Sequence, residues 1–275
     1  MAKSALLKSS LAKKYWMALT GLFLCLFLTG HLAGNLQLLV PHNAENFNKY
    51  ALFMTSNPAV KILSYLTYAS ILFHAFDGFL LTYQNIKARP IRYAKERQEA
   101  NTKWASRNMA ILGTLILIFI ITHMVHFWGR MHFDKKMPLY TTTIQVQPMM
   151  PPQEFYVTTA GSYLPVGGVD VVDRTQFFDK NAKVKIAEGY KDLYKITIAF
   201  FQDKAYGLLF TILYVISMLV LAFHLNHGFA SAFQSIGINN RKYNALIRGF
   251  GSFFSLVVPL LFAIIPVYIH FFLKA

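Results

Sequence analysis

Four histidines lie within four separate apolar segments of this 275-residue chain: His31, His74, His126 and His224. A glycine follows each of them three or four positions later, as Gly34, Gly78, Gly129 and Gly228. An ionisable side chain is costly inside a membrane segment, and it therefore marks a functional site by default. Neutral imidazole is the usual nitrogen ligand of haem iron, and a glycine about one helical turn away leaves room for a flat macrocycle. The four sites together predict two haems, each held by two histidines.

The segments that carry these histidines are long enough to cross a membrane. Hydrophobic residues make up 55% of the chain and are gathered into blocks, which is too apolar for an ordinary soluble domain. A bilayer of about 30 Å needs about 20 apolar residues. Five spans, I to V, are predicted near Trp16–Leu39, Ala59–Tyr83, Met109–Trp128, Tyr206–Phe229 and Phe250–Leu273. We expect an all-α integral membrane protein, one domain over residues 1–275, with spans I to IV forming a four-helix bundle around two stacked haems.

Two features of span I need separate interpretation. Four lysines precede it, as in a signal peptide, but its apolar run is too long and no small-residue cleavage site closes it, so we expect a retained helix. Cys25 within this span is the only cysteine of the chain. Disulfides, iron–sulfur clusters and covalently attached haem need more cysteine than this. Any haem must therefore be held non-covalently.

The formal net charge of +15 is distributed in a way that predicts membrane orientation rather than nucleic-acid binding. Short loops rich in Lys and Arg stay in the cytoplasm. Basic residues crowd the N-terminus and the II–III and IV–V loops, whereas the I–II loop has only Lys49. We therefore expect the N-terminus inside and the C-terminus outside. Residues 130–204 then form a long external loop, expected to be a small cap with some β structure and a surface helix from about Lys185.

This orientation sorts the histidines into two layers. His31 and His126 lie in the outer halves of spans I and III, and His74 and His224 lie in the inner halves of spans II and IV. With a rise of 1.5 Å per residue, the layers are roughly 10–20 Å apart. We expect His31 and His126 to hold an outer haem and His74 and His224 an inner haem, an arrangement suited to electron transfer across the membrane.

Other histidines compete for these roles. A single histidine in a membrane helix is more often a hydrogen-bonding or proton-relay residue than a haem ligand, so the set of four carries the hypothesis. His123 and His227 share a helix face with His126 and His224, and either could bond a haem propionate or line a quinone pocket instead. His270, near the outer end of span V, is expected in a packing or quinone-site role. His42 and His132 are expected to be solvated.

The motifs around the histidines resemble those of the cytochrome b subunit of succinate dehydrogenases and fumarate reductases, the b558-type, five-helix dihaem membrane anchor. The resemblance covers all five spans. It rests on G-L-F-L-x-L-F-L-x-x-H-L-x-G-N-L ending at Leu36, on H-A-x-D-G from His74, on H-F-W from His126, and on F-H-L-N-H-G-F-x-S-A-F-Q-S-I-G ending at Gly237. In related anchors the span IV histidine precedes the helix-ending glycine by thirteen residues, and His224 and Gly237 repeat that spacing.

The resemblance implies a subunit that takes electrons from a cytoplasmic flavoprotein and iron–sulfur pair and passes them to membrane quinone. Menaquinone is expected, because two haems accompany a single anchor chain, and the reverse reaction from menaquinol to fumarate uses the same parts. The succinate site would lie on a partner subunit, and the complex would lie in the bacterial cytoplasmic membrane and could dimerise. Iron with two histidine ligands has no open position for oxygen, which suits electron transfer.

Haem propionates and quinone need polar partners near the two haem layers. Candidates for the inner propionates are Lys87, Arg89, Arg92 and Arg107, and those for the outer ones are Gln37, Trp128 and Arg130. The quinone site is expected near the outer haem, among Asn35, Gln37, Glu45 and His123. Ala222 stands where some members of the family have a glutamate in span IV, which argues against a proton path of that kind.

Two other functions stay open on the sequence. A dihaem cytochrome b of another quinone-linked dehydrogenase would share the haem chemistry and differ in its soluble partner. A haem-free transporter with histidine proton relays predicts helices broken near the membrane midplane. Pro259 and Pro266 in span V are the only candidates for such breaks.

Overall fold

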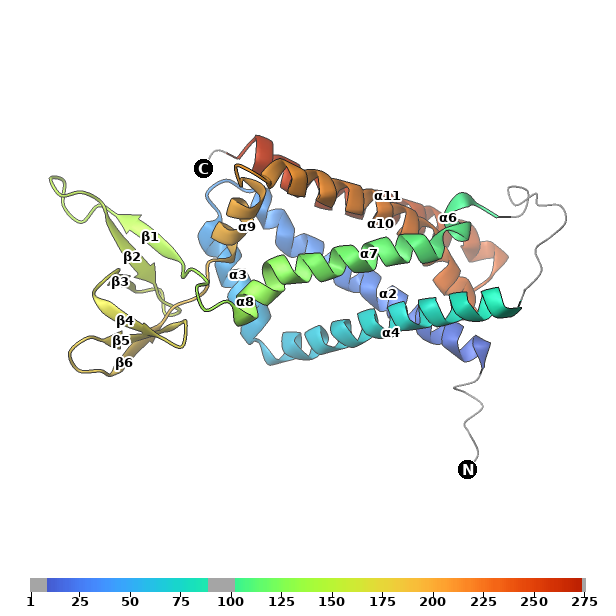
Figure 1. Cartoon of the computed structure of the whole chain (residues 1–275), viewed down its shortest axis with the longest axis horizontal. Coiled ribbons are helices and arrows are strands. Elements are labelled where there is room, and N and C mark those ends of the chain that lie inside the picture. The colour runs from blue at the N-terminus through green and yellow to red at the C-terminus, as the bar shows by residue number, and fades with distance from the viewer. Residues whose placement is uncertain (1–8, 89–101, 274–275) are drawn as a thin grey trace, which may run out of the picture. The chain divides into compact units, whose positions relative to one another are not determined.

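The computed structural model describes residues 9–88 and 102–273 and is mostly helical (Figure 1). Its long helices are α2 (Ser10–Asn35), α4 (Pro58–Ala88), α7 (Met109–His123), α10 (Gly207–Ser235) and α11 (Arg241–Phe271). With the short turns that extend them, five helices within the described residues are long and apolar enough to cross a membrane: Leu11–Leu39, Pro58–Ala88, Met109–Phe133, Gly207–Ser235 and Arg241–Phe271. All five predicted spans are found, and the length and composition of these helices identify a multi-pass membrane protein.

Local sequence accounts for the ends of these helices. Asn57 caps α4, because its side-chain oxygen accepts hydrogen bonds from the backbone N–H groups of Ala59 and Val60 (2.9 and 3.3 Å). Pro58 fits the first turn of α4, where a backbone N–H has no helical partner in any case. After α10 the chain turns at Gly237, whose φ of 88° is a conformation that glycine adopts without strain.

The third span is not one regular helix. α7 passes into a π-helical segment, η2 (Met124–Gly129), and then into α8 (Arg130–Phe133). A π-helical turn spans more residues than an α-helical turn, and π-bulges often occur at functional sites. His126 lies within this segment, a feature that the apolar pattern of the sequence does not predict.

The chain forms two compact units. The first comprises Met1–Leu36, Ile62–Ile121 and Thr211–Val267, and the second comprises Gln37–Lys61, Thr122–Phe210 and Tyr268–Ala275. Side chains of α2, α10 and α11 form the core of the first unit: Cys25, Leu32, Met218, Leu221, Leu225, Phe229, Phe254 and Val258. Because lipid tails are as apolar as these side chains, close packing is the main force that holds such helices together.

In the second unit, buried polar groups join helices α3 (Ala44–Ser56) and α9 (Leu193–Phe201). Asn48 donates a hydrogen bond to the carboxylate of Asp192 (2.7 Å) and accepts one from the N–H of Tyr194 (2.9 Å). Asp192 also caps α9 by accepting a bond from the N–H of Lys195 (2.9 Å). The I–II connection was expected to be a short loop, and α3 was not predicted from the sequence.

The segment between α8 and α9, which is expected to be external, contains two three-stranded antiparallel sheets. Their orders are β1–β2–β3 (Thr141–Ile144, Gln153–Val157, Tyr163–Pro165) and β4–β5–β6 (Val169–Val172, Gln176–Asp179, Lys185–Glu188). The expected β structure is therefore present, and the fold is not wholly α-helical. The expected helix start at Lys185 is wrong: residues from Lys185 pair with β5, and the helix begins only where Asp192 supplies an N-cap.

Candidate cofactor site

His74 of α4 and His224 of α10 are neighbours within the first unit. Their ring centroids lie 6.2 Å apart, with an angle of 70° between the ring planes. A metal–imidazole nitrogen bond is about 2.0 Å long, so two imidazoles on opposite sides of one metal have centroids about 6 Å apart. The two histidines expected to share the inner haem therefore have the spacing of a shared metal.

Helix α2 holds the ring of His74. Nδ1 of His74 lies 3.2 Å from the backbone oxygen of Met17 and 3.3 Å from Oγ1 of Thr20. The Thr20 hydroxyl donates to the backbone oxygen of Trp16 (2.8 Å), so it acts as an acceptor toward His74. Both neighbours favour a proton on Nδ1, which leaves the lone pair on Nε2. This is the second-shell arrangement that orients a metal-ligating histidine.

Glycines of two other helices lie beside these rings. A Cβ at Gly21 of α2 would be 3.1 Å from Cε1 of His74, and a Cβ at Gly113 of α7 would be 3.7 Å from Cε1 of His224. At Gly228, one turn after His224, a Cβ would meet nothing within 4 Å. The sequence pattern predicts clearance from glycines on the same helix as each histidine, whereas Gly21 and Gly113, which lie beside the rings, belong to other helices. An isolated glycine in an apolar helix was the available signal, since small residues mark close helix approach.

The Nδ1 atom of His224 is buried and has no hydrogen-bond partner among the described residues. A buried polar atom without a partner in a native structure indicates a water, ion or ligand. The donor set that haem takes from a protein is present here: two adjacent imidazoles, one of them oriented by acceptors at Nδ1 and the other with a buried Nδ1 that lacks a partner among the described residues. The residues present therefore fit a haem ligated by His74 and His224.

His31 lies in the first unit, among aromatic rings. Its ring stacks on Phe27, with 5.3 Å between centroids and 13° between planes, and tilts against Phe262 at 5.6 Å. Its Nδ1 is 3.4 Å from the side-chain nitrogen of Asn35, which also donates to the backbone oxygen of His31 (2.7 Å). Asn35, a predicted quinone-site residue, is thus engaged with the histidine itself.

His126 lies in the second unit, within η2. Its ring packs against Phe200 and Phe210, with centroids 4.6 and 5.7 Å away, and its Nδ1 is buried without a hydrogen-bond partner among the described residues. Because His31 and His126 belong to different units, their pairing on one iron stays a prediction.

The competing histidines have other neighbours. Nε2 of His227 lies 3.4 Å from the hydroxyl oxygen of Ser231. It is the ring of His224, not that of His227, that contacts the ring of His74. The ring of His123 tilts against Phe127 at 5.3 Å. In the second unit, Nδ1 of His270 lies 2.6 Å from the backbone oxygen of Phe201, a packing role. His42 and His132 are exposed, as predicted.

The predicted outer partners make local contacts. Arg130 pairs with Asp134 (3.4 Å), and the pKa of Asp134 is lowered chiefly by a hydrogen bond from the N–H of Lys136. Glu45 pairs with Lys49 (2.6 Å). Of the other outer candidates, Gln37 is half-buried and Trp128 stacks on His132. Of the inner candidates, Lys87 and Arg107 are exposed, and Arg89 and Arg92 lie outside the described residues. Their roles toward propionates or quinone stay predictions.

A metal site of another kind is not evident. No group of three or more His, Cys, Asp or Glu side chains that could hold a metal ion occurs in residues 9–88 and 102–273, but a haem with two histidine ligands takes only two from the protein. Comparison with protein families, characterised proteins and solved structures finds no match. The assignment therefore rests on the residues of the chain itself.

Proposed function

We propose that the chain is the haem-bearing membrane anchor of a succinate:quinone oxidoreductase, with menaquinone as the expected quinone. The observation that carries the proposal is the pair His74 and His224, 6.2 Å apart, with Nδ1 of His74 held at a backbone oxygen. Two neutral imidazoles are the ligand set of a six-coordinate haem b. Haem bound there would supply one-electron transfer, with no open iron position for oxygen.

The residues of the chain would have distinct tasks. His74 and His224 would hold the inner haem, and His31 and His126 the outer haem, in a bundle of the first four spans. Met17 would fix the ring of His74 through its carbonyl group. Apolar helix walls would keep water from both haems, which lowers the local dielectric and strengthens every fixed dipole around them.

The polar ends of the spans would serve the partners. The basic inner side would face the flavoprotein and iron–sulfur subunits, and Arg89, Arg92 or their neighbours would bind the inner propionates. Arg130 and Gln37 are the corresponding outer candidates. Quinone would be reduced near the outer haem, with His123 and Asn35 as candidate contacts. Succinate would be oxidised on the flavoprotein, at the cytoplasmic side of a bacterial membrane.

The structure of α11 argues against a transporter. α11 continues through both Pro259 and Pro266, whereas transporters of the kind considered use discontinuous helices near the midplane. A dihaem cytochrome b of another dehydrogenase would use the same histidines, so its soluble partner is what distinguishes it.

The test is to purify the chain from its native membrane with its partners and to record reduced-minus-oxidised spectra and a pyridine haemochrome assay. We expect two b haems per chain, a co-purifying flavoprotein and iron–sulfur protein, and reduction of a menaquinone analogue by succinate. Haem without succinate activity would assign the chain to another dehydrogenase. Well-folded protein without haem would overturn the proposal.

A further inference from the structure

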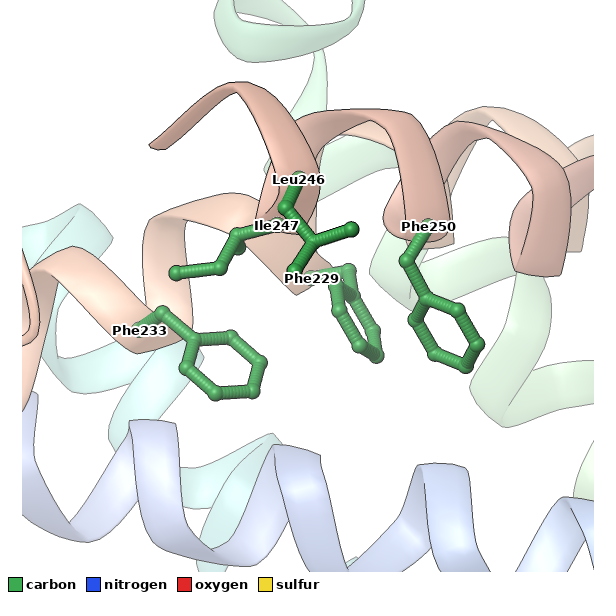
Figure 2. A pocket seen from close by; sticks show the side chains of 5 residues that line it. All are labelled: Phe229, Phe233, Leu246, Ile247 and Phe250. Carbon is green, nitrogen blue, oxygen red and sulfur yellow. The ribbon is translucent and has the colours of Figure 1, made fainter. Parts of the chain in front are cut away.

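The cavities of the two units differ in their lining. In the first unit an apolar cavity lies between α10 and α11 (Figure 2), lined by Phe229, Phe233, Leu246, Ile247 and Phe250. In the second unit a cavity of ≈ 430 Å³ lies at the end of α8, lined by His132, Phe133, Lys135, Asp173 and Arg174. Charged side chains from the turn between β4 and β5 therefore meet the end of the third span.

Two cationic side chains of the segment between α8 and α9 bond to the last turn of α8. The guanidinium of Arg174 donates to the backbone oxygen of His132 (2.7 Å), and the ammonium of Lys191 donates to the backbone oxygen of Met131. The last carbonyl groups of a helix have no partner within the helix, and they carry the negative end of its dipole. Arg174 and Lys191 therefore cap the C-terminal end of the third span.

The backbone holds both cations at this position. Asp173 and Arg174 have φ of 47° and 69°, a left-handed conformation that residues other than glycine adopt at a cost and that clusters at functional sites. Lys191 is followed by Asp192, whose N–H donates to the backbone oxygen of Pro138 (2.8 Å) in the connection after α8. Burial, and then the charge of Arg174, lower the pKa of Lys191, so the two cations lie close together despite their repulsion.

The caps fit α8 in the register that the π-helical segment η2 gives it. A regular helix through η2 would rotate α8 by about 100° relative to α7 and, at a helix radius of about 2.3 Å, would shift its backbone atoms by about 3.5 Å. This shift would carry both acceptors out of line with the two cations. It would also turn Met131 out of the buried cluster that it forms with Met137 and Ile196. The caps therefore favour the π-helical form of η2.

η2 is also fixed at the level of His126. The ring of His126 packs on Phe200 of α9 at 4.6 Å between centroids, and the ring of Phe127 lies 5.3 Å from that of Phe200 and 6.4 Å from that of Phe201. Asp192, the N-cap of α9, directly follows Lys191. The rings of α9 and the two caps therefore hold η2 from both ends.

We propose that Arg174 and Lys191 are positioning residues that set the direction of the His126 imidazole. The inference rests on the proposed function, in which His126 is a ligand of the outer haem. It gives the segment between α8 and α9 a task in that function: its two cations keep the extra residue of η2 in place, and η2 directs His126.

Three double variants of the purified complex test the inference. Arg174→Met with Lys191→Met removes both donors and keeps the length of each side chain. Arg174→Lys with Lys191→Arg keeps a cationic donor at each position and is the rescue variant. Lys183→Met with Lys185→Met is the matched control, because it removes the same two charges from exposed ion pairs with Asp170 and Glu188 in the same segment.

The readouts are a redox titration of the haems, their electron paramagnetic resonance spectra, and deuterium exchange of the backbone. In the donor-free variant we expect one haem signal to shift or to be lost and the other, from the haem at His74 and His224, to stay unchanged. The amides of residues 124–133 should exchange at least about tenfold faster, because a hydrogen bond from a charged group contributes at least about that factor. The rescue and control variants should behave as the unaltered chain does.

The unchanged haem reports that the donor-free variant is folded, and Arg174→Met alone replaces that variant if it yields no haem. Two unshifted haem signals in the donor-free variant would overturn the inference and leave the proposed function in place. An equal shift in the control variant would also overturn it, because the effect would then come from charge and not from the caps. Well-folded unaltered protein without haem would instead overturn the proposed function, and the role given to His126 with it.

Discussion

The chemistry of His74 depends on which ring nitrogen carries the proton. The Met17 carbonyl and the Thr20 hydroxyl both accept at Nδ1, so Nε2 is the nitrogen available to a metal. His74→Ala and His224→Ala should therefore each remove the same haem, because a haem site with two histidine ligands is disrupted when either is lost. The haemochrome assay should give one haem per chain in each variant, and still one in the double variant.

The matched control for this pair is His227→Ala. His227 is one turn from His224 on the same helix and contacts Ser231, so its removal should leave both haems in place. A loss of haem in His227→Ala, with full haem in His224→Ala, would show that the ligand assignment in α10 is wrong.

Gly21 offers a test that leaves every predicted ligand in place. A Cβ at this position would lie 3.1 Å from Cε1 of His74, so the larger side chain in Gly21→Val should displace the ring and lower the content of one haem. Gly249→Val in α11 is the matched control, since a Cβ there meets nothing within 4 Å and no predicted ligand is adjacent to it. Reduced-minus-oxidised spectra report both. Equal haem in the two variants would contradict the close approach of α2 to His74.

At the scale of the element, the π-helical segment η2 sets the direction of His126. Deleting Val125 would restore an α-helical turn and rotate His126 by about 100° relative to α7. We expect one haem to be lost and the other, at His74 and His224, to remain. Val125→Ala keeps the extra residue and should keep both haems. Two haems in the deletion variant would show that His126 does not need this segment.

The buried link between α3 and α9 gives a pH-dependent prediction for the second unit. Burial raises the pKa of Asp192 above its ordinary value of about 3.9. Between the ordinary and the raised pKa, the folded state retains a proton that the unfolded state has lost, so stability falls as pH rises through this window. Asp192→Asn cannot ionise, and its side-chain oxygen can still accept the bonds from Asn48 and Lys195.

Thermal unfolding of both proteins is measured by circular dichroism in detergent from about pH 4 to pH 7. The quantity compared is the midpoint temperature of Asp192→Asn minus that of the unaltered chain. This difference should become more positive as the pH rises. Parallel curves would show that Asp192 titrates as an ordinary carboxylate. In contrast, Asn48→Ala should lower the midpoint at every pH, because it leaves the partly buried N–H of Tyr194 without its acceptor, at a cost of about 1–3 kcal/mol.

For the molecule as a whole, the sequence predicts those features that the thickness of the bilayer determines. The thickness of the apolar core fixes the length of a span, so all five helices could be placed. Contacts between helices could not be predicted in this way. The approach of Gly21 to His74, for example, depends on the relative register of α2 and α4, which no local sequence pattern contains. α3 and the short strands from Thr141 to Glu188 were hard to predict for the same reason, since pairing with distant partners stabilises them.

The expected orientation of the whole chain, N-terminus inside and C-terminus outside, can be tested by thiol labelling without removing the native cysteine. Cys25 is buried within α2, so the unaltered chain should not react with a membrane-impermeant maleimide. Met149→Cys replaces a side chain that is 99% exposed in the segment between β1 and β2, and Ile238→Cys replaces one that is 45% exposed between α10 and α11. In intact cells whose outer envelope is permeable, Met149→Cys should be labelled, whereas Ile238→Cys should react only after lysis. The reverse pattern would invert the membrane orientation. It would place the basic loops and the His74–His224 pair on the outer side, where a cytoplasmic flavoprotein could not reach them.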